Sequence, residues 1–204
     1  MRYNYLSINS GSGEQTLASL TALPTGTWTH VAVTLDSASA TGTLYLNGAA
    51  VATGAITICP DGLLAANVAG GLQQNYLARA PGGVMPSFRG ALDDVQFYGA
   101  ALNAAAVAAM QPPTVPAAVG TLYVDLRASD SNAGSASWSN RGTSGAFAVT
   151  SSPTLASNVQ GTGVPGVLFN GTDQAYTGAN TTPDIDGSSD RSIEVRAYTA
   201  LQNG

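Results

Sequence analysis

The sequence predicts an all-β protein built as an antiparallel β-sandwich with one short helix. Apolar residues recur at every second position in short segments bounded by turn residues, as in strands with one buried face. An Asn-Gly pair lies between two such segments and predicts a tight hairpin. With 44% hydrophobic and only 9% charged residues, the chain is expected to form a packed core and not a disordered segment.

The alternating segments lie in both the first and the second part of the chain. In order, they are residues 4–8, 29–35, 43–46, 92–98, 122–126, 167–169 and 192–198. Asn47-Gly48 follows the third segment and precedes Ala50-Val51-Ala52, where a type I′ turn needs positive φ at both central positions. The sequence therefore predicts a two-residue hairpin at Asn47-Gly48.

One segment departs from the strand pattern. Residues 102–110 are rich in alanine and predict a short helix with Asn103 as its N-cap. The prolines that follow cannot continue a helix and favour an extended linker over residues 112–118. The chain is thus divided into a part of residues 1–111 and a part of residues 119–204.

Composition excludes several classes of partner. Lysine is absent, and seven arginines face twelve acidic residues for a net charge of −5, which disfavours nucleic acid. No apolar stretch approaches the roughly 20 residues that span a bilayer, so no membrane span is expected. The first residues enter a strand pattern at once, and no signal peptide is expected in this chain.

The residues needed for catalysis are sparse. His30 is the only histidine, so a serine or cysteine nucleophile has no second base available. The only glutamates, Glu14 and Glu194, are far apart in the sequence. Asp93 and Asp94 are adjacent in a strand and are expected on opposite faces, unable to act on one bond. The sequence therefore predicts that the chain is not an enzyme.

An exposed set of tyrosines and amides is the candidate ligand site. Strand alternation assigns residues such as Leu44 and Val95 to a buried face and their neighbours to an open one. Sugars bind to aromatic rings flanked by amides, so this open face is a candidate glycan site. Its predicted members are Tyr3, Tyr5, Tyr45, Asn47, Gln96 and Tyr98.

Three segments of the first part carry a resemblance to a known family. They are residues 26–36, beginning Gly-Thr-Trp-Thr-His-Val, residues 42–52, containing Leu-Tyr-Leu-Asn-Gly, and residues 88–98, Phe-Arg-Gly-Ala-Leu-Asp-Asp-Val-Gln-Phe-Tyr. Together with the helix at 102–110 they resemble the middle and end of a laminin-G-like domain. The resemblance implies a concanavalin A-like jelly roll, an antiparallel β-sandwich with one short helix.

The second part resembles the opening strands of the same family. The similar segments are residues 122–126, 167–176 and 192–198, with Arg196 at a place where the family usually has an aromatic residue. The order is therefore back part, linker, front part. Two interpretations remain open: a tandem array cut inside two successive domains, or a circularly permuted sandwich completed within one chain or by strand exchange between chains.

The resemblance also implies a metal and a cellular location. Many members of the wider family hold a structural Ca²⁺ between an aspartate of the closing strand and a turn near the front. Carried over by position, the ligands would be Asp94 with Asn170, Gly171 and Asp173. Members of this type are secreted or lie on the cell surface, so a bacterial-type extracellular location is expected.

These expectations define a function and its alternatives. The chain is expected to be a non-catalytic extracellular binding or adhesion module for a glycan or an extracellular protein, with Ca²⁺ as a structural ion. One alternative is a purely structural spacer of a large secreted protein, which would bind no ligand. The other is a fragment of a glycan hydrolase, which would need a carboxylate pair on one face.

Overall fold

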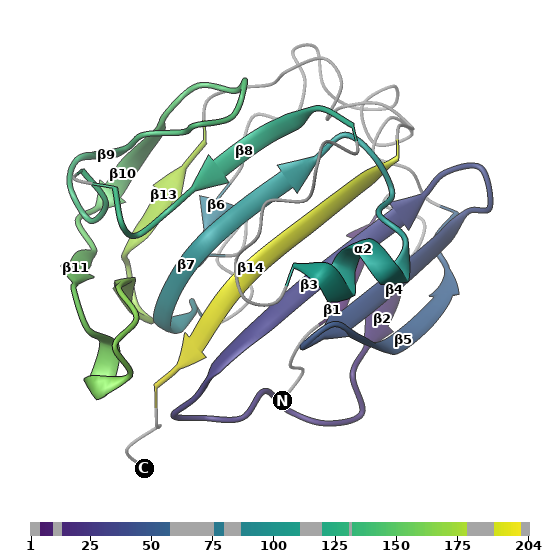
Figure 1. The fold of residues 1–204 in the computed structure, drawn as a ribbon, viewed down its shortest axis with the longest axis horizontal. Helices are drawn as coiled ribbons and strands as arrows, with labels where there is room; N and C mark the ends of the chain where they lie inside the picture. The colour runs from purple at the N-terminus through teal and green to yellow at the C-terminus, as the bar shows by residue number, and fades with distance from the viewer. Residues whose placement is uncertain are drawn as a thin grey trace.

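The chain forms an antiparallel β-sandwich with one short helix on its outer side, as predicted (Figure 1). This computed structural model describes residues 5–9, 14–57, 76–79, 87–110, 120–130, 132–178 and 190–200. Every pairing between its named strands is antiparallel.

An eight-stranded sheet forms the larger layer, in the order β11-β12-β7-β14-β3-β4-β5, with β8 also paired to β7. Because β14 runs along one edge of β7, β12 and β8 share the other edge, one at each end. The strands are β3 (Trp28–Asp36), β4 (Thr41–Leu46), β5 (Ala49–Ala55), β7 (Arg89–Tyr98), β8 (Leu122–Leu126), β11 (Thr154–Ala156), β12 (Gly166–Asn170) and β14 (Arg191–Thr199).

The other strands form two smaller sheets; in Figure 1, β9, β10 and β13 lie to the left of β7 and β8, and β1 and β2 lie behind β3, β4 and β5. One has four strands in the order β6-β13-β10-β9, and the other is the pair β1-β2. A short 3₁₀ helix, η2 (Val159–Gly161), precedes β12. The strands of the smaller sheets are β1 (Tyr5–Asn9), β2 (Glu14–Ala18), β6 (Tyr76–Leu77), β9 (Ser137–Trp138), β10 (Phe147–Ser151) and β13 (Ala175–Thr177).

The predicted hairpin joins β4 to β5. Asn47 has φ 47° and Gly48 has φ 75°, so both central residues of the turn are left-handed, as a type I′ turn requires. The side-chain oxygen of Asn47 also accepts a hydrogen bond from the backbone N–H of His30 at 3.0 Å. The Asn-Gly prediction is confirmed.

Helix α2 (Ala104–Ala109) packs against the front face of the large sheet, the face turned toward the viewer in Figure 1. The Asn103 side chain caps the helix by accepting from the backbone N–H of Ala106 at 2.9 Å, as predicted. Of the six helical residues only Val107 is buried, and it packs with residues of the sheet. The cluster beneath it consists of Ala32, Tyr45, Tyr98, Leu102, Val107 and Met110.

The main core lies between the back face of the large sheet and the four-stranded sheet. Trp138 is completely buried there, with its ring centroid 5.5 Å from that of Tyr176. Its indole N–H donates to the backbone oxygen of Arg127 at 3.0 Å, so the polar atom of this large side chain is satisfied. The surrounding side chains come from both layers: Leu92, Val95, Val124, Leu126, Phe147, Val167 and Phe169.

Strands from both parts of the chain share the large sheet. The C-terminal strand β14 lies between β3 and β7, which both belong to the first part. In Figure 1 this yellow strand runs through the middle of the sheet. The linker predicted over residues 112–118 lies outside the described residues, and the exact boundaries of the two parts stay a prediction.

Among the helices of the described residues, none is both long and apolar enough to cross a membrane.

Replacing Trp138 with alanine should lower the free energy of unfolding by about 3–5 kcal/mol, because it empties the centre of the main core. Urea unfolding measures the change. Leu20→Ala is the matched control, since the Leu20 side chain is fully exposed and its loss should change stability by about 0.5 kcal/mol or less. Equal stabilities of the two variants would contradict this account of the core.

Candidate functional site

A β-bulge in β7 turns two neighbouring carboxylates to the same face. The pairing between β14 and β7 shifts between Glu194 and Arg196, and Asp94 adopts a left-handed conformation with φ 48°. As a result, both Asp93 and Asp94 reach the guanidinium of Arg196, at 3.7 and 3.2 Å. The expectation that these aspartates point to opposite faces is wrong, because strict alternation fails at a bulge.

Arg196 lies between these carboxylates and an aromatic pair. Its guanidinium carbon is 5.6 Å from the ring centroid of Trp28, within the range of a cation–π contact. The Trp28 ring meets Tyr198 edge to face at 5.7 Å, and its indole N–H donates to Thr162 at 3.1 Å. The Arg196 side chain is 21% exposed, so it is held in one place yet reachable from solvent.

Further ion pairs continue this arrangement across β8. Asp125 accepts two hydrogen bonds from Arg127, at 3.0 and 2.8 Å, in the bidentate geometry that fixes both groups. Asp130 pairs with Arg141. Burial alone would raise the pKa of Asp125, but hydrogen bonds from Arg127 and Gln96 hold it below its ordinary value.

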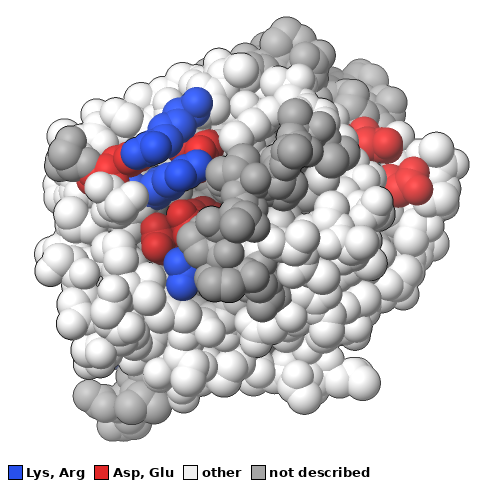
Figure 2. All heavy atoms as spheres, in the orientation of Figure 1, with Lys and Arg blue, Asp and Glu red and all other residues white. Residues whose placement is uncertain are grey.

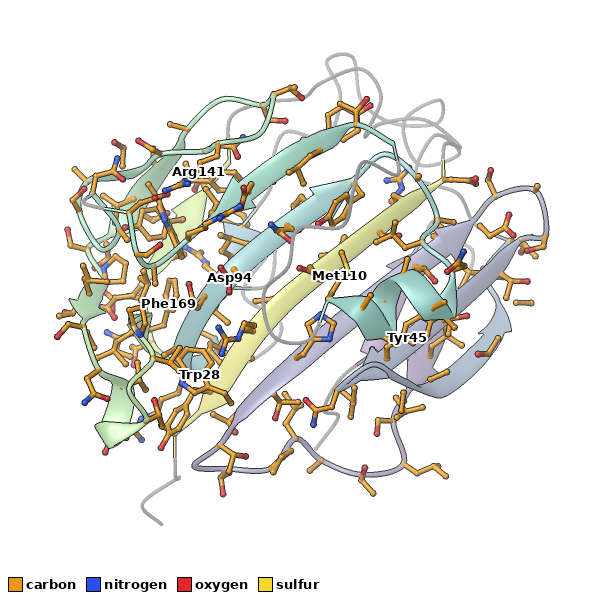
Figure 3. All side chains as sticks on the ribbon, in the orientation of Figure 1. Trp28, Tyr45, Asp94, Met110, Arg141 and Phe169 are labelled. Atoms are coloured by element: carbon orange, nitrogen blue, oxygen red, sulfur yellow. The ribbon has the colours of Figure 1, made fainter. Side chains whose placement is uncertain are left out.

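These groups form a surface that we call the charged row. Figure 2 shows arginine and acidic side chains gathered together over β8, β7 and β14. In Figure 3, Asp94 lies on the front face between Arg141 and Trp28. The charged row consists of Arg141, Asp130, Arg127, Asp125, Asp93, Asp94 and Arg196.

Asp93 is a buried carboxylate of the charged row that is held by backbone donors. Its Oδ1 accepts from the backbone N–H groups of Ala128, at 2.8 Å, and Asp94, at 2.9 Å, which ties β7 to the residues after β8. Burial raises the pKa of Asp93 to about 6, and the neighbouring Asp94 carboxylate adds to the increase.

A buried pair, His30 and Glu194, adjoins the charged row. Their side chains meet at 3.1 Å between β3 and β14, and both are less than 10% exposed. In the pairing of β3 with β14, His30 lies directly opposite Arg196. His30 is therefore part of the sheet's polar packing.

The first half of the chain matches a known protein family in sequence. A sequence model of the concanavalin A-like lectin/glucanases superfamily matches residues 2–108, more than half of the 204 residues. The chain belongs to this superfamily. No curated protein and no solved structure shows significant similarity to the chain. The superfamily agrees with the jelly-roll sandwich predicted from the sequence and is compatible with carbohydrate or protein binding.

The predicted ligand set of this concanavalin A-like chain is largely inaccessible. Tyr45, Gln96 and Tyr98 are each 5% exposed or less. The prediction that they are exposed is wrong, because α2 covers Tyr45 and Tyr98 on the face that alternation assigned to solvent.

Gln96 and Tyr98 are instead joined in a buried hydrogen-bond chain. The Tyr98 hydroxyl donates to the Gln96 oxygen at 2.8 Å, and the Gln96 amide donates to Asp125 at 3.1 Å. This chain connects the cluster under the helix to the charged row. Both side chains therefore support the site from below and do not line it.

The remaining predicted ligand residues have different outcomes. Asn47 is exposed, as predicted, and lies beside His30. Tyr5 belongs to β1, but its side chain lies outside what the structure describes, as does the whole of Tyr3. Of the four predicted residues whose side chains the structure describes, only Asn47 is exposed.

The predicted calcium ligands Asp94 and Asn170 lie far apart in this structure. Asn170 pairs with Arg89, five strand positions from Asp94, or roughly 16 Å at the rise of a β-strand. The Asp94 carboxylate already pairs with Arg196. These residues do not fit the calcium site that the resemblance implied, and calcium binding itself stays a prediction.

The turn that carries the other predicted calcium ligands is closed by its own hydrogen bonds. The Asn170 side-chain oxygen accepts from the backbone N–H groups of Thr172 and Asp173, at 2.9 and 3.2 Å. Asp173 accepts from the Asn170 amide at 2.7 Å and from Ser151 at 2.9 Å. Gly171, with φ 76°, supplies the left-handed residue that this turn needs. The turn has a structural role that these contacts explain.

Sequence reasoning missed most of the charged row. Arg127, Asp125 and Trp28 drew no functional prediction, although each lies at or beside a strand end. The usable signal was Arg196, a charged residue at a strand position where the superfamily usually has an aromatic one. A charge in a buried strand needs a partner of opposite sign, and Asp93-Asp94 was the conspicuous acidic pair in the sequence.

Raising the pH from 4 to 7 should lower the free energy of unfolding of the wild type by up to about 3 kcal/mol more than that of the Asp93→Asn variant, which lacks the titrating carboxyl group. The pKa of Asp93 is about 6 in the folded state and near 3.8 in the unfolded state, so between these pH values the folded state binds more protons. Raising the pH therefore favours the unfolded wild type. Urea unfolding of both proteins across this range measures the difference, and a difference that stays constant or grows with pH would contradict the prediction.

Proposed function

We propose that the chain is a non-catalytic binding module that holds a neutral glycan on the charged row. The observation that supports this most directly is Arg196, fixed between the Asp94 carboxylate and the Trp28 ring and still partly exposed. An aromatic ring, a planar donor and a planar acceptor within one small area match the apolar faces and paired hydroxyls of a sugar ring.

The charged row offers hydrogen-bond donors and acceptors that are already ordered. Guanidinium groups donate in a fixed planar arrangement, and carboxylates accept at two oxygens. The Arg127 side chain is 29% exposed and that of Arg141 is 51% exposed, although both are held by carboxylates. Groups that are ordered before binding lose less conformational entropy when a ligand arrives.

The balance of charge favours a neutral ligand. Four aspartates and three arginines make up the charged row, so their charges nearly cancel. The whole chain carries a net charge of −5, which repels polyanions. A neutral polysaccharide is therefore the ligand class that we propose, in preference to a sulfated or phosphorylated one.

The contacts of the carboxylates support binding without catalysis. A glycan hydrolase needs one carboxylic acid to protonate the leaving group and a second carboxylate to act as nucleophile or base. Asp93 has the raised pKa of an acid, but it is buried and accepts from two backbone N–H groups. Asp94 and Asp125 are each neutralised by an arginine. We assign these carboxylates to the support of the binding surface.

The proposed ligand also bears on the cellular location. Polysaccharides are encountered mainly outside the cytoplasm, and laminin-G-like domains are commonly extracellular. We propose that the module acts in a secreted or cell-surface protein of the bacterial type, where it attaches that protein to a glycan.

Arg141→Ala and Arg196→Lys should each weaken binding to a neutral polysaccharide by about tenfold, the effect of losing one or two charge-assisted hydrogen bonds. Arg141→Ala removes the most exposed arginine of the charged row, and Arg196→Lys keeps the charge but loses the planar donor. Affinity electrophoresis on a panel of neutral and acidic polysaccharides, with calcium and with a chelator, measures the retention.

Arg89→Ala is the matched control, because Arg89 is an exposed arginine outside the charged row. It should bind as the wild type does. If no polysaccharide retains the wild type, the module is a spacer or a protein-binding domain. If incubation releases new reducing ends, and Asp93→Asn abolishes their release, the module is a hydrolase and the proposal is wrong.

A further inference from the structure

Strand β14 is enclosed by strands from the first part of the chain. Residues 191–198 pair with residues 28–35 of β3, and residues 192–199 pair with residues 90–98 of β7. The other strands of the second part in the large sheet all lie on the far side of β7, where β8 and β12 pair with β7 and β11 pairs with β12. β14 thus enters a groove between β3 and β7 as a single strand, separated by β7 from its own part of the chain.

Near the start of β14, the groove contacts the side chains of the strand as well as its backbone. The Ser192 hydroxyl donates to the backbone oxygen of Ala100 at 2.7 Å and accepts from the N–H of Leu102 at 2.8 Å, next to helix α2. Two positions further along, Glu194 meets His30 at 3.1 Å.

Toward the end of β14, every second side chain again contacts a residue of the first part of the chain. Arg196 meets Asp94 at 3.2 Å, and Tyr198 packs against Trp28. Successive front-facing side chains of β14 therefore each have a specific partner in the first part of the chain.

Both ends of the strand are also secured by the first part. Asp190 accepts from the backbone N–H and the hydroxyl of Ser37, at 2.8 and 2.7 Å. At the other end, the Thr199 hydroxyl donates to Pro24 at 2.6 Å, and the Gly26 N–H donates to Thr199 at 3.0 Å. These contacts fix the register of the strand, since a slip by one residue would break all of them.

We propose that the groove between β3 and β7 accepts β14 from a second copy of this chain as well as from its own. Thirteen residues separate β13 from β14 in the sequence, and such a length reaches roughly 45 Å when extended. Exchange conserves every contact named above, so the exchanged and unexchanged forms differ mainly in chain entropy, and protein concentration sets their ratio.

Exchange has a consequence for the charged row. Asp94 and Trp28 come from the first part of the chain and Arg196 from β14, so each site in an exchanged dimer combines residues of two copies. Two sites then lie on one particle, which raises its avidity for a polymeric ligand. The exchange itself does not depend on the proposed glycan.

A charge-reversal experiment separates exchange from folding within one chain. Arg196→Glu places a carboxylate against Asp94, and Asp94→Arg places a guanidinium against Arg196, so each variant alone has a mismatched groove. When the two are unfolded together and refolded, an exchanged heterodimer brings the two substituted side chains, now of opposite charge, together in one groove. Its other groove regains the native pair of Asp94 and Arg196.

The expected product has twice the 20.4 kDa mass of the chain by light scattering, and its melting midpoint is roughly 5 °C above that of either variant. The double variant Asp94→Arg/Arg196→Glu is the matched control, because it can restore the reversed pair within one chain. It should melt near the midpoint of the refolded mixture. A mixture that stays monomeric, or that melts as the sum of its separate components, overturns the proposal.

A second measurement uses the wild-type chain and no substitution. Unlabelled and ¹⁵N-labelled chains are unfolded, mixed and refolded at increasing concentration, and native mass spectrometry then detects mixed dimers. Their fraction should rise with concentration, and its absence at all concentrations overturns the proposal. Neither readout involves a glycan, so failure of exchange and failure of the proposed ligand are separate results.

Discussion

The pairing of β14 with both β3 and β7 is the constraint on which the rest of the structure depends. Without this strand the large sheet would be divided, and both neighbours would expose unpaired N–H and C=O groups. β14 also contributes Ala197 to the main core, while Tyr198 packs on the front face. One strand of nine residues thus joins the backbone ladder, the core and the candidate site.

The bulge in β7 follows from that pairing and creates the candidate site. An extra residue in β7 places Asp93 and Asp94 on one face, opposite Arg196 of β14. Two like charges so close together are tolerated because Arg196 pairs with both carboxylates. The backbone N–H groups of Ala128 and Asp94 also donate to Asp93. The same contacts hold the arginine against Trp28, so the structural solution for buried charge also presents an ordered polar surface.

The outcome of the sequence predictions depends on how local each feature is. The Asn47-Gly48 turn and the Asn103 cap were predicted correctly because each is decided within a few residues of backbone. Exposure was predicted wrongly for Tyr45 and Tyr98, since a helix about sixty residues after Tyr45 covers them both. Alternation identifies the two faces of a strand but does not tell how many of them are covered.

The sequence by itself determined the all-β class, the family, the hairpin and the helix, because periodicity and turn chemistry act over short distances. Only the tertiary structure decided that β14 enters between β3 and β7, that Asp93 and Asp94 share a face, and that Arg196 meets them. These outcomes depend on pairing between residues that are roughly 100 positions apart for β14 with β7 and roughly 160 apart for β14 with β3, and on a bulge of one residue. A shift of one position in register reverses every side chain, and nothing local to either strand specifies that register.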